Sequence, residues 1–320
     1  LLSLISIVLI ALVGFIIFTI FNDYKPKDVE MLNLDIGSSD TNLEKNTPYT
    51  IVTFNTGYGG LGESQDFFMD GGSGSGAKTK EEAMTNTQAI SKFLDTLDAD
   101  FNLLQEVDLD SKRSQHINQY EQYLNHQNKT FAMNYRNRFV PVPLTRPMGQ
   151  VKSGIVTASK SIPFEITRHK FEGEESFLVQ LFELDRNFTI SKYYVEDKIL
   201  YIINAHFSAY DKGGKIRQQQ LNQIQNILIE AYNNGHYVIL GGDFNHELPG
   251  ADSSIFTYKQ DYPDWIQSLP SDFTPQGYTW AIDPNTPTVR DLMKPYVPDD
   301  NFVAVIDGFL VSNNIEIIEV

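Results

Sequence analysis

The sequence contains no cysteine at all. This absence excludes a scaffold held by disulfide bonds and any zinc site built from thiolates, and it is compatible with a bacterial surface protein. Basic residues are scarce, because 25 Lys and Arg stand against 41 Asp and Glu and give a formal net charge of −16 at pH 7. A non-specific nucleic-acid binder normally carries a basic surface, so this balance disfavours such a function unless a local basic patch exists.

Charged residues are also missing from Leu1 to Phe21. A helix of this length measures about 32 Å, which is enough to span the hydrocarbon core of a bilayer. No small-x-small cleavage site precedes Asn22, so we expect an uncleaved transmembrane signal anchor over residues 1–21 rather than a removed signal peptide. A buried core helix is the competing interpretation, but the polar stretch that follows suits a membrane exit better. We expect a single-pass protein of the cell membrane with the rest of the chain outside the cell.

The remainder of the chain divides into a short connecting segment and one large domain. Asp35 to Pro48 is rich in Ser, Asn, Thr and Asp, and we interpret residues 22–48 as a tether. No linker interrupts residues 49–320, which are long enough for one large domain. We expect this domain to be monomeric.

Hydrophobic periodicity predicts alternating strands and helices. The expected helices are 82–97, 117–127 and 215–232. The expected strands are 50–55, 101–106, 154–159, 177–184, 199–205, 237–240, 303–311 and 315–320. Because several strands are consecutive, the pattern is typical of a mixed sheet or of two packed sheets with outer helices.

The most informative segment is Gly241-Gly242-Asp243-Phe244-Asn245, which directly follows an apolar strand pattern. The two glycines allow a sharp backbone turn, and Asp243 and Asn245 project from the same side of an extended segment. In a phosphoester hydrolase such an Asp can polarise a water, and such an Asn can steady that water or a phosphate oxygen. The competing interpretation is an ordinary strand-to-loop turn, where these residue types are common.

Polar side chains also mark other expected strands. Asn55, Glu106, Asn204 and His206 lie at or near strand ends, and Asp307 lies inside an apolar run, where a lone acid is costly. Ligand sites in sheet proteins gather at strand ends. Carboxylate and amide oxygens suit Mg²⁺ or Mn²⁺ better than zinc.

Taken together, these segments resemble the endonuclease/exonuclease/phosphatase superfamily, which has the DNase I-like fold. The resemblance covers about residues 49–320 and implies an α/β (α+β) four-layer sandwich of two face-to-face mixed β-sheets flanked by helices. It also implies a divalent-metal phosphoesterase. The matching pieces follow the family's order and are Thr53-Phe54-Asn55, Leu104-Gln105-Glu106-Val107-Asp108, Ser153-Gly154-Ile155-Val156, Asn204-Ala205-His206-Phe207, Gly242-Asp243-Phe244-Asn245, Thr279-Trp280 and Ile306-Asp307-Gly308-Phe309.

The resemblance assigns a role to most of these polar residues. Glu106 would be the principal ligand of a Mg²⁺ or Mn²⁺ ion, helped by Asn55. Asp243 would orient or deprotonate the attacking water, and Asn245 would hold that water or a phosphate oxygen. His206 would hydrogen-bond the scissile phosphate and protonate the leaving oxygen.

The resemblance gives Asp307 a different role, that of orienting a second histidine. The family usually supplies this histidine in a C-terminal Ser-Asp-His segment, and none follows Asp307 here. Because the sequence also starts without Met, we expect truncation at both ends, which leaves open whether the fragment itself is active.

Three further residues are candidates for binding substrate, namely Asn204, Arg113 and Arg290, although each arginine can equally be a solvated surface residue. The leading hypothesis is a membrane-anchored, Mg²⁺-dependent phosphodiesterase or phosphatase. Its substrate is open between nucleic acid, a phospholipid head group and a small phosphoester. The acidic balance disfavours duplex DNA, and the anchor favours a substrate near the membrane. The alternative is a non-catalytic surface binding module that keeps the fold.

Overall fold

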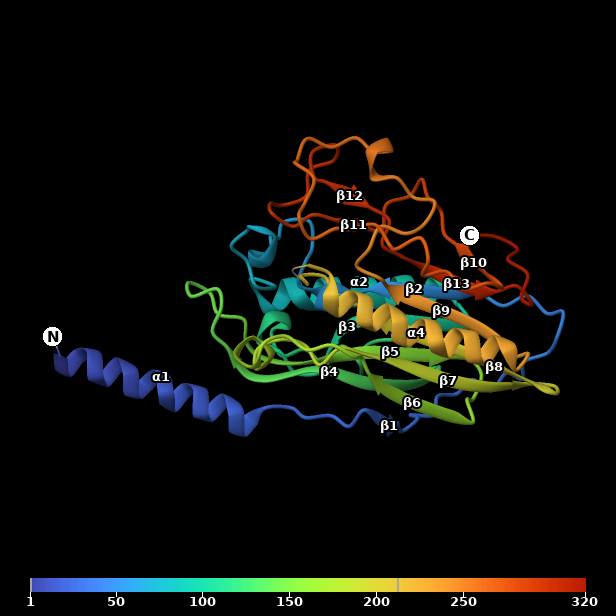
Figure 1. Cartoon of the computed structure of the whole chain (residues 1–320), viewed down its shortest axis with the longest axis horizontal. Helices are drawn as coiled ribbons and strands as arrows, with labels where there is room; N and C mark the ends of the chain where they lie inside the picture. The colour runs from blue at the N-terminus through green and yellow to red at the C-terminus, as the bar shows by residue number, and fades with distance from the viewer. Residues whose placement is uncertain (1, 212) are drawn as a thin grey trace.

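The computed structural model describes residues 2–211 and 213–320. Two β-sheets lie face to face, with one long helix on the outer face of each (Figure 1). The four-layer sandwich implied by the resemblance is therefore confirmed.

The larger sheet has seven strands and carries helix α4 (Lys215–Asn233) on its outer face. Strands β8 and β9 are parallel and all other neighbouring pairs are antiparallel. Leu221, Ile224 and Leu228 of α4 lie one helical turn apart and pack against Ile203 and Leu240 of the sheet. The strand order is β1 (Val29–Met31), β6 (Glu165–Lys170), β7 (Asn187–Val195), β8 (Lys198–His206), β9 (Tyr237–Asp243), β13 (Asp307–Ser312) and β10 (Tyr278–Ala281).

The smaller sheet has four strands and carries α2 (Lys80–Leu97) on its outer face. The hydroxyl of Thr79 accepts a hydrogen bond from the Glu82 amide at 3.1 Å and caps the start of α2. Leu94 of α2 packs on Leu104 and Val156. The strand order is β2 (Ile51–Asn55), β3 (Phe101–Asp108), β5 (Gly149–Ser159) and β4 (Asn128–Val140), with only β2 and β3 parallel.

The layer between the sheets is mainly apolar. Phe101 and Leu103 of β3 meet Tyr193, Ile202 and Phe309 of the larger sheet. Alternate residues of β3 face α2 instead, so both faces of this strand are buried and its sequence shows no polar alternation.

Short elements lie in the loops around the sandwich. The β11–β12 pair (Val289–Arg290 and Val303–Ala304) forms its own small sheet in the upper loops of Figure 1. The others are η1 (Gly57–Gly59), η2 (Phe68–Asp70), η3 (Lys112–Ser114), α3 (Phe177–Gln180) and η4 (Ser253–Ile255).

Helix α1 (Leu2–Asn22) extends away from the sandwich (Figure 1). Among the described residues it is the helix that is long and apolar enough to cross a membrane, with a mean hydropathy of 3.1. The segment after it does not behave as a free tether, contrary to our expectation. β1 pairs with β6, and Leu43 is buried against the domain. Apolar side chains and an open sheet edge thus fix residues 22–48 to the sandwich.

Three expected elements are wrong. Residues 117–127 form turns rather than a helix, because the backbone and side chain of Gln119 bond to Asp108 of β3. The strand expected over 177–184 is replaced by α3, whose apolar residues are exposed. No strand forms over 315–320, and the run 303–311 is divided between β12 and β13.

Candidate active site

The polar strand ends predicted from the sequence meet at one edge of the sandwich. The parallel pairing of β8 and β9 places His206 beside Asp243. The antiparallel pairing of β9 and β13 places Asp307 on the other side of Asp243. Three neighbouring strands of the larger sheet therefore present His206, Asp243 and Asp307 in one row.

The two glycines before Asp243 are required by close packing. A Cβ atom on Gly242, whose φ is +145°, would lie 1.9 Å from the carbonyl oxygen of Ala205 on β8. A Cβ atom on Gly241 would lie 2.5 Å from the ring of Phe309 on β13. The glycines thus let β9 lie tightly between its neighbours, which fixes the position of Asp243.

The smaller sheet contributes Glu106 through an irregularity in β3. The β3–β5 register shifts between Leu104 and Val107, and Glu106 has a φ of +56°. Such a bulge redirects a side chain, and left-handed backbone in a residue other than glycine is concentrated at functional sites. Glu106 Oε1 lies 4.0 Å from Nε2 of His206.

Asn55 joins the carboxylates of the two sheets. Its Nδ2 donates to Asp243 Oδ2 at 2.9 Å and to Glu106 Oε1 at 3.3 Å. Its Oδ1 accepts from the amide of Gly57 at 3.0 Å. The amide oxygen therefore points away from the carboxylates, so Asn55 holds them in place here rather than presenting a ligand oxygen beside Glu106.

Asn245 closes the same cluster from the loop after β9. Its backbone amide donates to Asp243 Oδ1 at 2.9 Å, and its Nδ2 donates to the carbonyl oxygen of Phe207 at 2.8 Å. Its φ of +49° turns the chain immediately after the strand. Asn245 thus orients Asp243 and lines the same cavity.

Burial and crowding shift the protonation of these groups. Burial raises the pKa of Asp243 to about 6 even though the amides of Asn55 and Asn245 donate to it, and the charge of Glu106 adds to the rise. Burial and the neighbouring Asp243 raise the pKa of Asp307 well above its usual value. Burial lowers the pKa of His206 well below its usual value, so its imidazole is neutral at pH 7.

The crowding of acids fits a cation. Asp307 Oδ1 and His206 Nδ1 are shielded from solvent without a hydrogen-bond partner among the described residues. Oxygen donors from Glu106, Asp243 and Asp307 are the chemistry that a hard divalent ion prefers. Over residues 2–211 and 213–320, however, no group of three or more His, Cys, Asp or Glu forms a ready-made metal cluster. The oxygen atoms are therefore of the type that Mg²⁺ or Mn²⁺ binds, but the side chains are not arranged as a preformed coordination site.

A cavity of about 620 Å³ opens over this cluster. Glu106, His206, Asp243, Asn245 and Asp307 form its polar part. Much of the remaining wall is apolar and includes Phe54, Phe68, Val142, Phe182, Leu184 and Trp265. The cavity therefore suits a phosphoester that also carries an apolar or aromatic group.

The structure does not place Asn204 in this cavity. Its side chain is fully buried between the sheets, where Oδ1 accepts from Gln105 Nε2 at 2.8 Å and Nδ2 donates to the carbonyl oxygen of Val156 at 2.9 Å. The substrate-binding role expected for Asn204 is therefore corrected to a contact that joins the two sheets.

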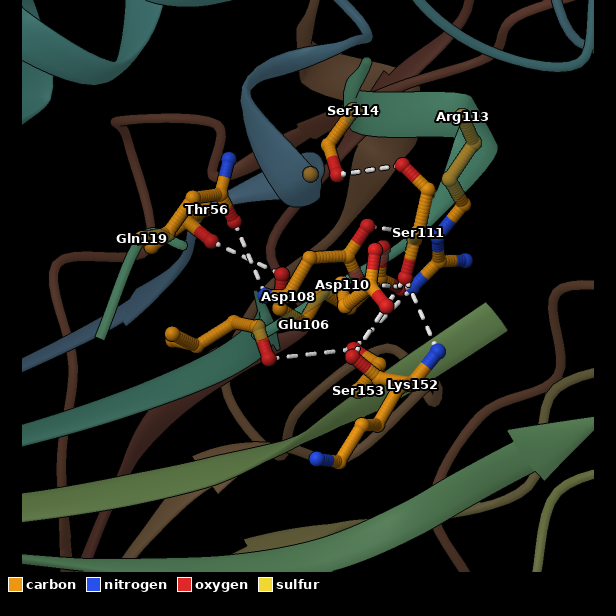
Figure 2. A network of polar contacts seen from close by, with 12 residues as sticks. Thr56, Glu106, Asp108, Asp110, Ser111, Arg113, Ser114, Gln119, Lys152 and Ser153 are labelled. Carbon is orange, nitrogen blue, oxygen red and sulfur yellow. Dashed lines mark hydrogen bonds and ion pairs between the residues drawn. The ribbon is translucent and has the colours of Figure 1, made fainter. Parts of the chain in front are cut away.

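Arg113 lines the cavity, but its guanidinium is already engaged. It forms a two-point ion pair with Asp108, at 2.9 and 3.2 Å, and donates to Ser153 Oγ at 3.1 Å. Its other partner is the ring of Tyr58, whose centroid lies 3.9 Å away. Figure 2 shows the guanidinium of Arg113 directed toward Asp108 and Ser153. Arg113 thus supports the wall of the site.

Arg290 has a similar supporting position. Its Nη2 donates to the carbonyl oxygens of Leu61, Gly62 and Gln65, and its Nη1 donates to that of Lys294. These bonds hold the loop between β2 and α2 over the cavity, which Arg290 also lines. Both predicted arginines thus direct most of their hydrogen bonds to groups of the protein itself.

Sequence reasoning missed Arg186. This half-buried arginine lines the cavity, and its Nη1 donates to the carbonyl oxygen of Phe207 at 2.5 Å. Burial lowers the pKa of Arg186, whereas the carboxylates of Glu183, Asp243 and Glu106 oppose that shift. It follows the segment in which we expected a strand, and no local pattern marks it.

Comparison with known protein families identifies the family of this chain. A family model described as "Endonuclease/Exonuclease/phosphatase family" matches residues 52–316. The chain belongs to the endonuclease/exonuclease/phosphatase family, and this membership supports phosphoester hydrolysis as its general class of chemistry. A comparison with curated proteins finds no match.

Solved structures with a similar fold share little sequence. Truncated TDP2 of Caenorhabditis elegans is 15% identical with a TM-score of 0.46, over 82% of this chain and 83% of that chain. ANGEL2, a 2′,3′-cyclic phosphatase, is 16% identical with a TM-score of 0.46, and the match covers 90% of this chain and 87% of ANGEL2. An endonuclease/exonuclease/phosphatase from Beutenbergia cavernae is 13% identical with a TM-score of 0.49, over 82% and 64%.

Proposed function

We propose that the chain is a membrane-anchored phosphoesterase that uses a divalent metal to hydrolyse a phosphodiester or phosphomonoester by direct attack of water. The observation that carries this proposal is the meeting of Glu106, His206, Asp243 and Asp307 in one cavity although they come from four strands of two sheets. A structural role alone does not require acids of raised pKa to be crowded at a cavity.

The side chains divide the chemistry between them. Glu106 is the principal group that would hold Mg²⁺ or Mn²⁺, and Asp307 adds negative charge beside it. Such an ion would neutralise charge on the phosphate oxygens. Asp243, whose pKa is about 6, is ionised at neutral pH and can orient water and accept its proton. Asn245 holds Asp243 in that orientation.

His206 acts as a neutral hydrogen-bond donor to the substrate phosphate. Its low pKa means that at neutral pH the imidazole does not carry a spare proton. We therefore favour phosphate binding over proton donation to the leaving group as its main role. Arg186 is the charged side chain that we assign to substrate phosphate in place of Arg113 and Arg290, which direct most of their donors to the protein.

The anchoring part of the proposal rests on α1. Its length, apolar composition and exposed side chains are those of a segment that lies in a bilayer. We propose that it holds the domain at the surface of the cell membrane, with the domain acting as a monomer outside the cell.

The test is hydrolysis of bis-p-nitrophenyl phosphate and p-nitrophenyl phosphate by the purified chain. We expect turnover with Mg²⁺ or Mn²⁺ and none after chelation by EDTA. The Glu106→Gln variant is the matched control, because it keeps the shape of the side chain and removes its charge. No hydrolysis of either ester with any divalent ion, together with an unchanged melting temperature on adding the ion, would favour a non-catalytic binding module.

A further inference from the structure

The loop between β4 and β5 exposes large apolar side chains beside the cavity. In the loop Leu144 is 86% exposed and Val142 41%, and Phe139, close to the end of β4, is 40% exposed. Val142 also lines the cavity, so the exposed group is continuous with the apolar wall of the candidate active site. Neighbouring exposed apolar residues mark interaction surfaces, because water is a poor solvent for them.

Helix α1 contacts the end of β4, next to this loop. The ring of Phe15 meets that of Phe139 edge to face, with centroids 6.2 Å apart, and stacks on that of Phe182 at 6.0 Å. Figure 1 shows the β4–β5 loop projecting from the sandwich toward the side on which α1 extends. A bilayer that contains α1 would therefore reach the loop.

Helix α3 adds to this apolar side of the molecule. Phe177, Leu178 and Val179 are 64%, 57% and 45% exposed. Phe182, two residues after α3, is the ring on which Phe15 stacks. Acidic residues flank α3 on both sides in the sequence, so α3 supplies apolar contact and no positive charge.

The β4–β5 hairpin is basic in an otherwise acidic chain. Between Glu121 and Glu165 there is no Asp or Glu. Arg136 and Arg138 are exposed and form no ion pair among the described residues. The basic residues of the segment are Lys129, Arg136, Arg138, Arg146, Lys152 and Lys160.

We propose that the β4–β5 loop docks the domain onto the same bilayer that α1 enters, with a preference for anionic lipid. Phe139, Val142 and Leu144 would enter the boundary between headgroups and acyl chains, while Arg136 and Arg138 contact lipid phosphates. Apolar tips flanked by cationic side chains are the combination that binds a bilayer surface. The inference rests on the proposed anchoring role of α1.

Docking in this way has a consequence for the substrate. It turns the part of the cavity lined by Val142, Phe182 and Leu184 toward the membrane. The substrate class that fits is then an amphiphile that presents its phosphoester at the lipid surface. A nucleic acid would use the arginines of the hairpin and leave Leu144 in water.

The lack of cysteine makes the docking directly measurable, because one introduced thiol carries one label. In the full chain, Leu144→Cys would report the loop and Val8→Cys would report α1. Ile318→Cys is the matched control. Ile318 is 74% exposed, comparable to Leu144, but lies in the C-terminal segment after β13. Each variant carries an environment-sensitive fluorophore and is reconstituted into phosphatidylcholine vesicles with or without one third phosphatidylglycerol.

We expect lipid-borne quenchers to quench the labels at Val8 and Leu144, and aqueous iodide to quench the label at Ile318. Quenching at Leu144 should be stronger in the anionic vesicles, and Arg136→Gln with Arg138→Gln should remove that difference. A label at Leu144 that behaves like the one at Ile318, while the one at Val8 is lipid-quenched, would overturn the docking surface and leave the anchor standing. If lipid-borne quenchers also fail to quench the label at Val8, the anchoring role of α1 is rejected.

Discussion

Asp307 lies directly opposite Asp243 in the antiparallel pair of β13 and β9. The acid that looked isolated inside an apolar run is therefore one of two adjacent carboxylates. Each raises the cost of ionising the other, and burial adds to that cost. A bound cation would offset this repulsion.

Glu106→Gln should remove most metal-dependent hydrolysis of bis-p-nitrophenyl phosphate and leave the fold intact. The amide keeps the shape of the side chain but does not supply the negative charge that holds the ion. Turnover and melting temperature would be followed while Mg²⁺ is titrated. An unchanged titration curve and unchanged turnover would rule out Glu106 as the main ligand.

Asp243→Asn and His206→Ala should each lower kcat by about two orders of magnitude or more, the usual scale for positioned acid–base groups. KM should change less, because these groups act mainly in the transition state. Steady-state kinetics on the three proteins would check this. A rise in KM with kcat unchanged would contradict both roles.

Asp307→Asn should raise the melting temperature in EDTA and reduce the further rise produced by Mg²⁺. The raised pKa of Asp307 means that its ionisation destabilises the folded state as pH rises. The uncharged Asn side chain removes that cost. A gain of about 1 kcal/mol in the free energy of unfolding raises the melting temperature of a large domain by roughly 2 °C. A lower melting temperature in EDTA would show that the carboxylate is compensated by other groups.

Asn204→Leu should lower kcat with little change in KM. The substitution removes the bond from Gln105 Nε2 to the other sheet, at a cost of about 1 kcal/mol, and leaves that nitrogen its bonds to Thr53 and Leu103 of the smaller sheet. Gln105 is adjacent to Glu106, so loss of this contact also misplaces a site residue. The matched control is Tyr193→Phe, which removes a 3.0 Å bond to Ser159 between the sheets at the other end of β3. That variant should lose stability but keep kcat, whereas a pure KM effect in Asn204→Leu would restore a substrate-binding role.

Asp185→Asn should raise the melting temperature at pH 7.5 and have no effect near pH 4. Burial, with the charge of Asp23 as a further cause, raises the pKa of Asp185 from 3.8 to about 6. Between pH 3.8 and about 6 the folded state therefore binds more protons than the unfolded state. The free energy of unfolding falls as pH rises through this range. Melting curves across pH would be compared with those of Glu316→Gln, which replaces an exposed acid. An equal effect of Asp185→Asn at both pH values would contradict the shifted titration.

Much of the fold and of the polar cluster followed from local sequence signals. Asn55, His206 and Asp243 each end an apolar strand, Glu106 lies two residues before the end of β3, and the ends of neighbouring strands meet at one edge. Metal, substrate and bilayer are partners outside the chain, so local sequence patterns carry less information about them than about the fold.

Other features depend on tertiary contacts that local patterns do not carry. Asn204 and His206 share one face of β8, but only His206 is close enough to the sheet edge to reach the cavity. Arg113 meets Asp108 through the turn at η3. Arg186 lies just after the segment 177–184, in which we expected a strand, and directly before β7, so nothing in its neighbours pointed to the cavity.

Asn55 and Glu106 belong to the smaller sheet, whereas His206, Asp243 and Asp307 belong to the larger one. Neither sheet alone carries a complete site. Any ligand that touches both groups spans the seam of the sandwich and must leave before the layers can separate. Occupancy would therefore slow unfolding, and resistance to a protease would rise in step with saturation of the site.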